Sequence, residues 1–117
     1  FDAHGVDYDR HVRMLAPMPE AEFHAFAAGM DVNLDSIGWS GGVSTLDLLA
    51  QGLPTVTVDT PTLRGRQTAG ILRRAGVADT IAAGADGYVD TAVALGRDRA
   101  LREHLRERLL AARERVY

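Results

Sequence analysis

The chain contains no cysteine and no lysine. Without cysteine it can form no disulfide and no thiolate metal site, which fits a reducing compartment such as the cytoplasm. All 13 basic residues are arginine, and 16 acidic residues bring the formal net charge to −3. Nucleic-acid-binding domains normally carry a basic patch or stripe, so this balance argues against that class. There is also no apolar run of membrane-spanning length and no signal-like N-terminal segment.

The rest of the composition is that of an ordinary folded domain. The 117 residues are 46% hydrophobic and 25% charged, which suits one domain with a single core. No internal repeat, low-complexity tract or long linker divides residues 1–117. Because the chain opens at Phe1, we expect an N-terminally truncated piece of a longer protein.

Hydrophobic periodicity and turn residues predict alternating strands and helices. Strands are expected at residues 11–15, 31–35, 55–58 and 78–82, and helices at 19–28, 44–51, 66–75, 87–96 and 98–116. This alternation predicts an α/β fold with a Rossmann-like parallel sheet and right-handed crossovers. The strands that contain Leu34, Val56 and Ile81 should be neighbours, whereas the first strand should be displaced or left as an exposed edge.

The loop at residues 36–42 contains three glycines and precedes a helix. Ligands of parallel sheets bind at the carboxyl ends of strands, near helix N-termini. A diphosphate could bind to the amides of Val43, Ser44 and Thr45 and to the hydroxyls of Ser44 and Thr45. The glycines, which have no Cβ atom, would let the backbone come close to it. Asp47 could then accept hydrogen bonds from two ribose hydroxyls. The alternative is a glycine-rich turn before a serine-capped helix, with Asp47 serving the helix dipole.

Other candidates also have two interpretations. Arg64 and Arg66 could approach a phosphate or lie in solvent, and Asp35 could contact a sugar or cap the following loop. Trp39 could stack on a sugar or a base, or anchor the loop. His24, on the first expected helix, is interpreted as a surface or rim residue in preference to a base. The four histidines show no metal-binding spacing.

The arginine- and glutamate-rich stretch at residues 97–115 is typical of a solvated helix face with i, i+4 ion pairs.

Residues 11–110 resemble the C-terminal part of the O-linked N-acetylglucosamine transferase / SPINDLY family in its bacterial form. The resemblance rests on ordered segments: M-L-A-P-M-P, D-V-N-L-D-S, S-G-G-V-S-T-L-D-L-L-A-Q-G-L-P-T-V-T, T-L-R-G-R-Q-T-A-G-I-L-R-R-A-G-V and A-D-T-I-A-A. It implies a GT-B glycosyltransferase, with two Rossmann-like halves and an active site between them. This chain would be a partial C-terminal, nucleotide-sugar-binding half.

The resemblance also implies roles for individual residues. The diphosphate-binding loop and helix start of the family are matched by Gly42, Val43, Ser44 and Thr45, and its ribose-binding acidic residue is matched by Asp47. Met18 lies where the backbone contacts uracil, and Glu20 and Phe23 match positions that border the nucleoside. Arg66 matches an arginine that is usual in the family. The family commonly has threonine or asparagine where Val43 stands. Animal members carry basic and imidazole groups where Glu20, Phe23 and Phe26 stand.

By resemblance, the intact enzyme transfers a sugar, expected to be N-acetylglucosamine, from its UDP conjugate to a hydroxyl of a protein serine or threonine or of a glycan. Neither a cofactor nor a metal is expected, and no residue here is assigned as catalytic. The expected partners within the full-length protein are an N-terminal Rossmann half and helical (TPR) repeats, so the isolated chain should be inactive. The alternative is a non-catalytic αβ module that binds a nucleotide or a protein partner.

Overall fold

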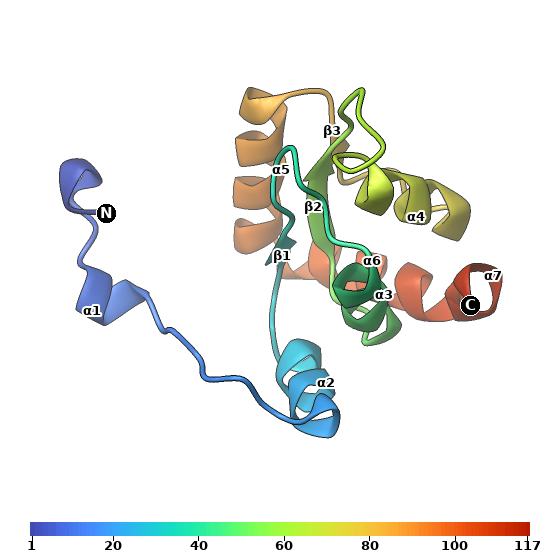
Figure 1. The fold of residues 1–117 in the computed structure, drawn as a ribbon, viewed down its shortest axis with the longest axis horizontal. Coiled ribbons are helices and arrows are strands. Elements are labelled where there is room, and N and C mark those ends of the chain that lie inside the picture. The colour runs from blue at the N-terminus through green and yellow to red at the C-terminus, as the bar shows by residue number, and fades with distance from the viewer.

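A computed structural model describes all residues 1–117 and places three parallel strands in the order β1–β2–β3 (Figure 1). The strands are β1 (Asn33–Leu34), β2 (Thr55–Val58) and β3 (Ile81–Ala82). Leu34 lies opposite Val56, and Thr57 lies opposite Ile81. Every residue of β2 is buried, as β-branched residues in the centre of a parallel sheet should be. The predicted fold class and strand order are confirmed.

Two crossover helices connect the strands. Helix α3 (Val43–Ala50) joins β1 to β2, and α4 (Gln67–Ala75) joins β2 to β3. Gly76 ends α4 with a φ of 74°, a left-handed conformation that glycine adopts without a steric penalty. The sequence predicted both helices to within one residue at each end.

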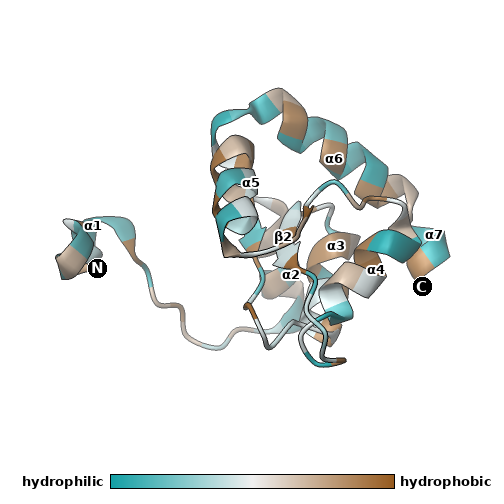
Figure 2. Cartoon of the chain, turned by 90° about the horizontal axis from the view of Figure 1, so that it is seen from above, coloured by the Kyte–Doolittle hydropathy of each residue, from teal (hydrophilic) through white to brown (hydrophobic).

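The remaining helices cover the sheet and close the core. Helix α5 (Ala85–Arg97) packs on β2 and β3, on the side of the sheet opposite α3 and α4 (Figure 1). Helix α6 (Arg99–Ala111) contacts α3 and α5, and α7 (Arg113–Val116) contacts α4. Figure 2 shows hydrophobic residues interrupting the mostly hydrophilic surface of α6. The buried core comprises Leu49, Val56, Leu72, Ala75, Val77, Leu95, Leu105, Leu109 and Ala112.

The prediction of one helix over residues 98–116 is wrong in one respect. The chain leaves α6 at Ala112, which is 1% exposed, before α7 begins. Burial of Ala112 in the core brings α7 against α4.

The predicted strand at residues 11–15 does not form. The chain begins with a 3-10 turn (Asp2–His4) and α1 (Tyr8–His11), and then runs as an extended segment to α2 (Glu20–Ala28). The Asp7 side chain accepts a hydrogen bond from the Arg10 amide at 3.2 Å, which draws residues 8–11 into a helical turn. Residues 13–18 make no backbone hydrogen bond, so a sequence with strand character has no strand to pair with. Figure 1 shows residues 1–19 extending away from the sheet.

Arginines from the C-terminal helices cap the ends of earlier helices. Five of them donate hydrogen bonds to main-chain carbonyl oxygens at or just beyond the last turns of α2, α3, α4 and α5. The pairs are Arg102 with Leu95 and Gly96, Arg106 with Gln51 and Met30, Arg108 with Gly76, Arg113 with Ala50, and Arg115 with Ala75. The last carbonyls of a helix have no partner within it and carry partial negative charge, so the cationic guanidinium suits them.

This finding corrects the interpretation of residues 97–115 as a solvated face with i, i+4 pairs. Arg99 and Glu103 do form such a pair, at 2.8 Å. Five other arginines reach main-chain carbonyls, and those bonded to Arg106, Arg108, Arg113 and Arg115 lie 32 to 76 residues away in sequence. None of the helices combines the length and the hydropathy that crossing a membrane requires.

The capping arginines lead to a stability prediction. Arg106 bridges the carbonyls of Gln51 and Met30, each at 3.1 Å, through its two terminal nitrogens. We expect Arg106→Lys to lower the free energy of unfolding by about 0.5–1.5 kcal/mol, because lysine lacks the fork that reaches both oxygens. The control Arg99→Lys, at a side chain that is 83% exposed, should change it by less than about 0.5 kcal/mol. Urea denaturation measures both, and equal losses would contradict the capping role.

Candidate functional site

The predicted ligand site lies where β1 ends and α3 begins. A cavity of about 400 Å³ opens there, at the carboxyl end of the sheet. It is lined by Asn33, Leu34, Asp35, Ser36, Trp39, Ser40, Gly41, Gly42, Ser44, Thr45 and Leu48. Most of these residues come from the glycine loop and the first turns of α3, as expected for a ligand site at the edge of a parallel sheet.

The carboxylate of Asp35 organises this loop from within. Asp35 is 5% exposed, and its Oδ1 accepts a hydrogen bond from the Gly41 amide at 2.8 Å. Its Oδ2 accepts hydrogen bonds from the hydroxyls of Ser40 at 2.8 Å and Thr57 at 2.7 Å. A buried carboxylate is stable only when such donors replace water. Of the two roles considered for Asp35, the structure supports capping of the loop.

A chain of buried hydroxyls continues from Asp35 to α4. The Thr68 amide donates to Ser40 Oγ at 2.9 Å, and the hydroxyl oxygens of Ser40 and Thr68 lie 2.7 Å apart. The Thr68 hydroxyl also donates to the Gly41 carbonyl at 3.1 Å and lies 2.9 Å from Thr45 Oγ1. Thr45 and Thr68 are 1% and 0% exposed. The glycine loop, α3 and α4 are therefore joined by one network.

This network changes the predicted role of Thr45. Its hydroxyl points inward to Thr68 and is not available to a ligand, so only its amide can serve. Ser44, by contrast, is exposed and makes no hydrogen bond through its hydroxyl to another protein group. Long-range contact with Thr68 decides the orientation of Thr45, and local sequence does not report it.

Packing favours glycine at the two positions before α3, more strongly at Gly41, where the nearest atom belongs to the buried Thr45, than at Gly42, where it is the end of the flexible Gln67 side chain. A Cβ atom on Gly41 would lie 2.5 Å from Thr45 Oγ1, and one on Gly42 would lie 2.7 Å from Gln67 Oε1. Both distances are shorter than van der Waals contact. The glycines thus bring the loop against α3 and α4.

The N-terminus of α3 has amides without acceptors. The first amide of the helix to find a main-chain acceptor is that of Leu46, which donates to Gly42 at 3.1 Å. The amides of Val43, Ser44 and Thr45 donate to no protein group, and no side chain caps the helix. No acidic residue lies in the first turn. The alternative of a serine-capped helix with a dipole-serving carboxylate is therefore not what the chain adopts.

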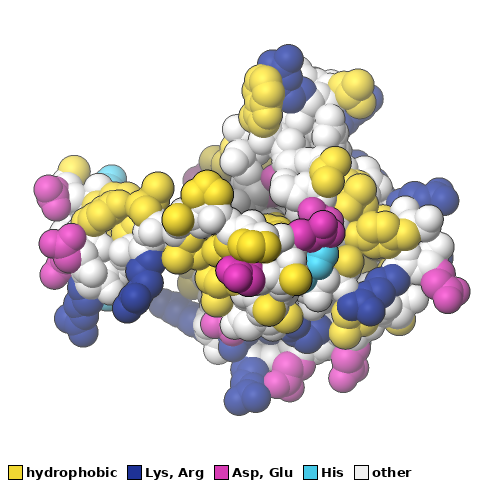
Figure 3. All heavy atoms as spheres, turned by 60° about the horizontal axis from the view of Figure 1, so that its bottom comes forward, with side chains coloured by type: hydrophobic (Ala, Val, Ile, Leu, Met, Phe, Trp, Pro, Cys, Tyr) yellow, Lys and Arg dark blue, Asp and Glu magenta, His cyan; other side chains and the backbone are white.

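Asp47 lies beside α2, which brings three of the relevant side chains together. Its Oδ1 is 3.8 Å from His24 Nε2, and that nitrogen is 3.9 Å from Glu20 Oε1. His24 Nε2 is buried and has no hydrogen-bond partner. Figure 3 shows a histidine next to an acidic side chain on the face that includes α2, among hydrophobic side chains. The His24 side chain is 30% exposed, which agrees with a place at the rim, and its contact with Asp47 joins two helices, so no local spacing reports it.

The other predicted residues lie on three elements. Met18 precedes α2 and Phe23 lies on it, and both are half-buried. Arg66 lines a separate cavity of about 590 Å³ together with Gly42 and Val43, on another side of the α3 N-terminus. Glu20 and Asp47 thus meet at His24, and Arg66 approaches the start of α3 from α4. The two cavities at that helix start are lined by none of Met18, Glu20, Phe23 and Asp47.

Tyr88 fastens the site to α5. Its hydroxyl donates to the Asp35 carbonyl at 2.8 Å. Burial, and secondarily the negative charge of Asp35, raises the pKa of Tyr88 above its usual value, so this donor keeps its proton at neutral pH.

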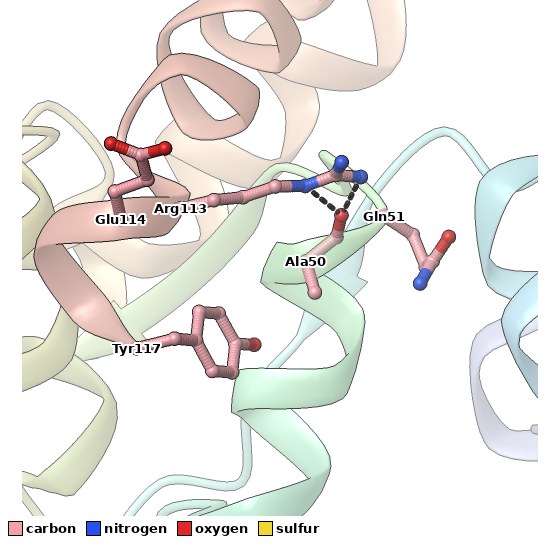
Figure 4. A pocket seen from close by; sticks show the side chains of 5 residues that line it. All are labelled: Ala50, Gln51, Arg113, Glu114 and Tyr117. Carbon is pink, nitrogen blue, oxygen red and sulfur yellow. Dashed lines mark hydrogen bonds between the residues drawn. The ribbon is translucent and has the colours of Figure 1, made fainter.

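A larger cavity of about 640 Å³ lies at the opposite end of α3, and none of the predicted site residues lines it. Figure 4 shows Arg113 reaching the Ala50 carbonyl there, and the Tyr117 hydroxyl bonds to the Leu46 carbonyl. This cavity borders the arginine cap of α3.

Two comparisons report similarity to known proteins. The model of glycosyl transferase family 41 matches residues 4–116. A solved structure of a mutant O-GlcNAc transferase from Thermobaculum terrenum superposes with a TM-score of 0.91 at 34% sequence identity. The match covers 98% of this chain and 22% of that chain. No curated protein matches.

The hydroxyl network predicts unequal effects for two threonine substitutions. Thr68→Val should destabilise the fold by about 1–3 kcal/mol, because buried partners around it lose a hydrogen bond. Thr80 is 3% exposed and its hydroxyl has no partner, so Thr80→Val should be neutral or stabilising. Urea denaturation of both variants compares them at constant side-chain shape. Equal losses would show that the network adds nothing beyond packing.

Proposed function

The chain belongs to glycosyl transferase family 41, and on that basis we propose that it binds the UDP-sugar donor of a glycosyltransferase. The donor is UDP-N-acetylglucosamine by the family resemblance. The acceptor is a hydroxyl, that of a protein serine or threonine or of a glycan.

The observation that carries this proposal is the uncapped start of α3. The amides of Val43, Ser44 and Thr45 point out of a helix N-terminus with no protein acceptor. Such amides, with the positive end of the helix dipole, favour a diphosphate. The buried network of Asp35, Ser40 and Thr68 holds the loop in this conformation before a ligand arrives. Little reorganisation is then required on binding.

The nucleoside is assigned to the side of α3 that faces α2. Asp47 accepts hydrogen bonds from the two ribose hydroxyls in this proposal, and His24 lies behind its carboxylate. Glu20 and Phe23 border the base, and the Met18 backbone contacts uracil. Arg66 approaches the diphosphate from the start of α4, since it lines the cavity that it shares with Gly42.

The chemistry follows from the leaving group. The acceptor oxygen forms a bond to the anomeric carbon while the bond from that carbon to the diphosphate oxygen breaks, and UDP departs. Negative charge develops on the diphosphate, and the preorganised amides of α3 stabilise it. The acceptor proton passes to a base that we do not assign to this chain.

The rest of the enzyme is also part of the proposal. The chain spans 22% of the transferase chain that it matches. We assign the acceptor side of the active-site cleft to a second, N-terminal Rossmann-like half, and we propose that the full-length protein also contains helical repeats. We place the enzyme in the cytoplasm. This chain alone is then inactive in transfer.

Binding of UDP should be visible at α3. In a titration of the ¹⁵N-labelled chain with UDP, we expect the amide signals of Val43, Ser44 and Thr45 to shift most, because they gain an acceptor. Inorganic pyrophosphate should shift the same amides, and uridine should shift signals of α2 and Asp47. Absence of any shift at α3 at millimolar UDP would refute the proposal.

Substitution of Asp47 tests the ribose contact. We expect Asp47→Ala to weaken UDP binding about 10- to 100-fold, since a hydrogen bond to a charged acceptor contributes about 1.5–3 kcal/mol. The control Asp90→Ala removes an exposed carboxylate on α5 and should leave UDP binding unchanged. Calorimetry gives the affinities and thermal unfolding checks that both variants fold. Unchanged UDP affinity in Asp47→Ala would reject this assignment.

A further inference from the structure

We propose that Trp39 is the surface on which the sugar ring of the nucleotide-sugar donor stacks, and that Arg64 holds the indole in place. The inference rests on the proposed function and names a residue that recognises the sugar of the donor. It concerns the exposed part of the glycine loop, which the buried network does not explain.

Trp39 is exposed in a loop whose neighbouring residues are fixed. Its side chain is 63% exposed, whereas Ser40, the next residue, is 5% exposed and bonded to Asp35. A large apolar side chain on a rigid exposed loop is a common ligand contact. Trp39 lines the same cavity as Gly42 and Ser44 at the start of α3. The indole therefore shares one cavity with Ser44 and Thr45, two of the three residues whose amides are assigned to the diphosphate.

Arg64 lies against one face of the indole. Its guanidinium carbon is 3.8 Å from the ring centroid, which is the geometry of a cation–π contact. The Ser40 amide donates to the Arg64 carbonyl at 3.0 Å, so the two loops are also joined through the main chain. Trp39 lines the cavity and Arg64 does not. Because Arg64 covers one face and Trp39 is still 63% exposed, we assign the opposite face of the ring to the cavity.

The position of the pair distinguishes the sugar from the base. The proposed function assigns the nucleoside to the side of α3 where Asp47 contacts His24 of α2, whereas Arg64 belongs to the loop that precedes α4. Figure 1 shows this loop and the glycine loop at the upper end of the sheet, away from α2 at the bottom. With the diphosphate on the amides between them, the sugar lies toward Trp39. The C–H face of a pyranose is apolar and suits the free face of an indole.

The test uses the fact that Trp39 is the single tryptophan of the chain, so tryptophan emission reports on it alone. UDP-N-acetylglucosamine should change this emission more than UDP does at equal site occupancy. Trp39→Ala should weaken binding of UDP-N-acetylglucosamine about 3- to 10-fold and leave that of UDP within about twofold, by the size of an aromatic stacking contact. Trp39→Phe, which keeps a ring, should recover most of the loss.

Two further variants complete the experiment. Arg64→Ala should weaken UDP-N-acetylglucosamine binding by about twofold, because the indole loses a contact that orients it. The control Val89→Ala removes an apolar side chain of α5 that is 56% exposed and lines neither cavity, and it should change neither affinity.

The outcomes separate this inference from the proposed function. If Trp39→Ala weakens UDP and UDP-N-acetylglucosamine equally, or weakens neither, the sugar contact is rejected while UDP binding at α3 stands. If the unmodified chain binds neither nucleotide, both proposals fail. Thermal unfolding of each variant shows whether a loss of affinity comes from a loss of folding.

Discussion

The hydrogen bonds to the buried carboxylate of Asp35 are the interaction on which the site depends. Three donors from the glycine loop and β2 surround the carboxylate, while its main-chain carbonyl receives the Tyr88 hydroxyl from α5. Two of the three donors, the Ser40 hydroxyl and the Gly41 amide, belong to the loop itself. If the loop opened, a buried charge would lose most of its partners, which is energetically costly. The burial of Asp35 and the closed loop therefore require each other.

The same network separates the scaffold of the site from its ligand-facing surface. The hydroxyls of Ser40, Thr45 and Thr68 face inward, whereas Trp39, Val43 and Ser44 face solvent. The inward-facing hydroxyls make the loop rigid, and the solvent-facing residues are those that a ligand can contact. Because Gly41 and Gly42 pack directly on α3 and α4, the amides of α3 stay exposed without a side chain to cover or cap them.

The sequence predicted what depends on local pattern. Hydrophobic periodicity and the glycine and proline positions placed β2, α3 and α4 and the loop between β1 and α3. It could not predict contacts made across the fold. Thr45 finds Thr68, 23 residues away, and no local pattern reports that contact. At residues 11–15 the local pattern predicted a strand that does not form, because strand-like residues form a strand only when another strand lies beside them. The contact of His24 with Asp47 likewise joins two helices.

The arginine caps make the order of synthesis matter. The carbonyls that they cap belong to helices that emerge first, and the arginines lie 55 and 76 residues later for Gln51 and Met30. During translation, α2, α3 and α4 thus leave the ribosome with open C-terminal ends, and residues 102–115 arrive last to close them. Contacts of such sequence separation carry the entropy cost of closing a long loop and slow folding. We therefore expect the domain to complete its folding only after α6 and α7 have been synthesised, because their arginines stabilise the C-terminal ends of the earlier helices.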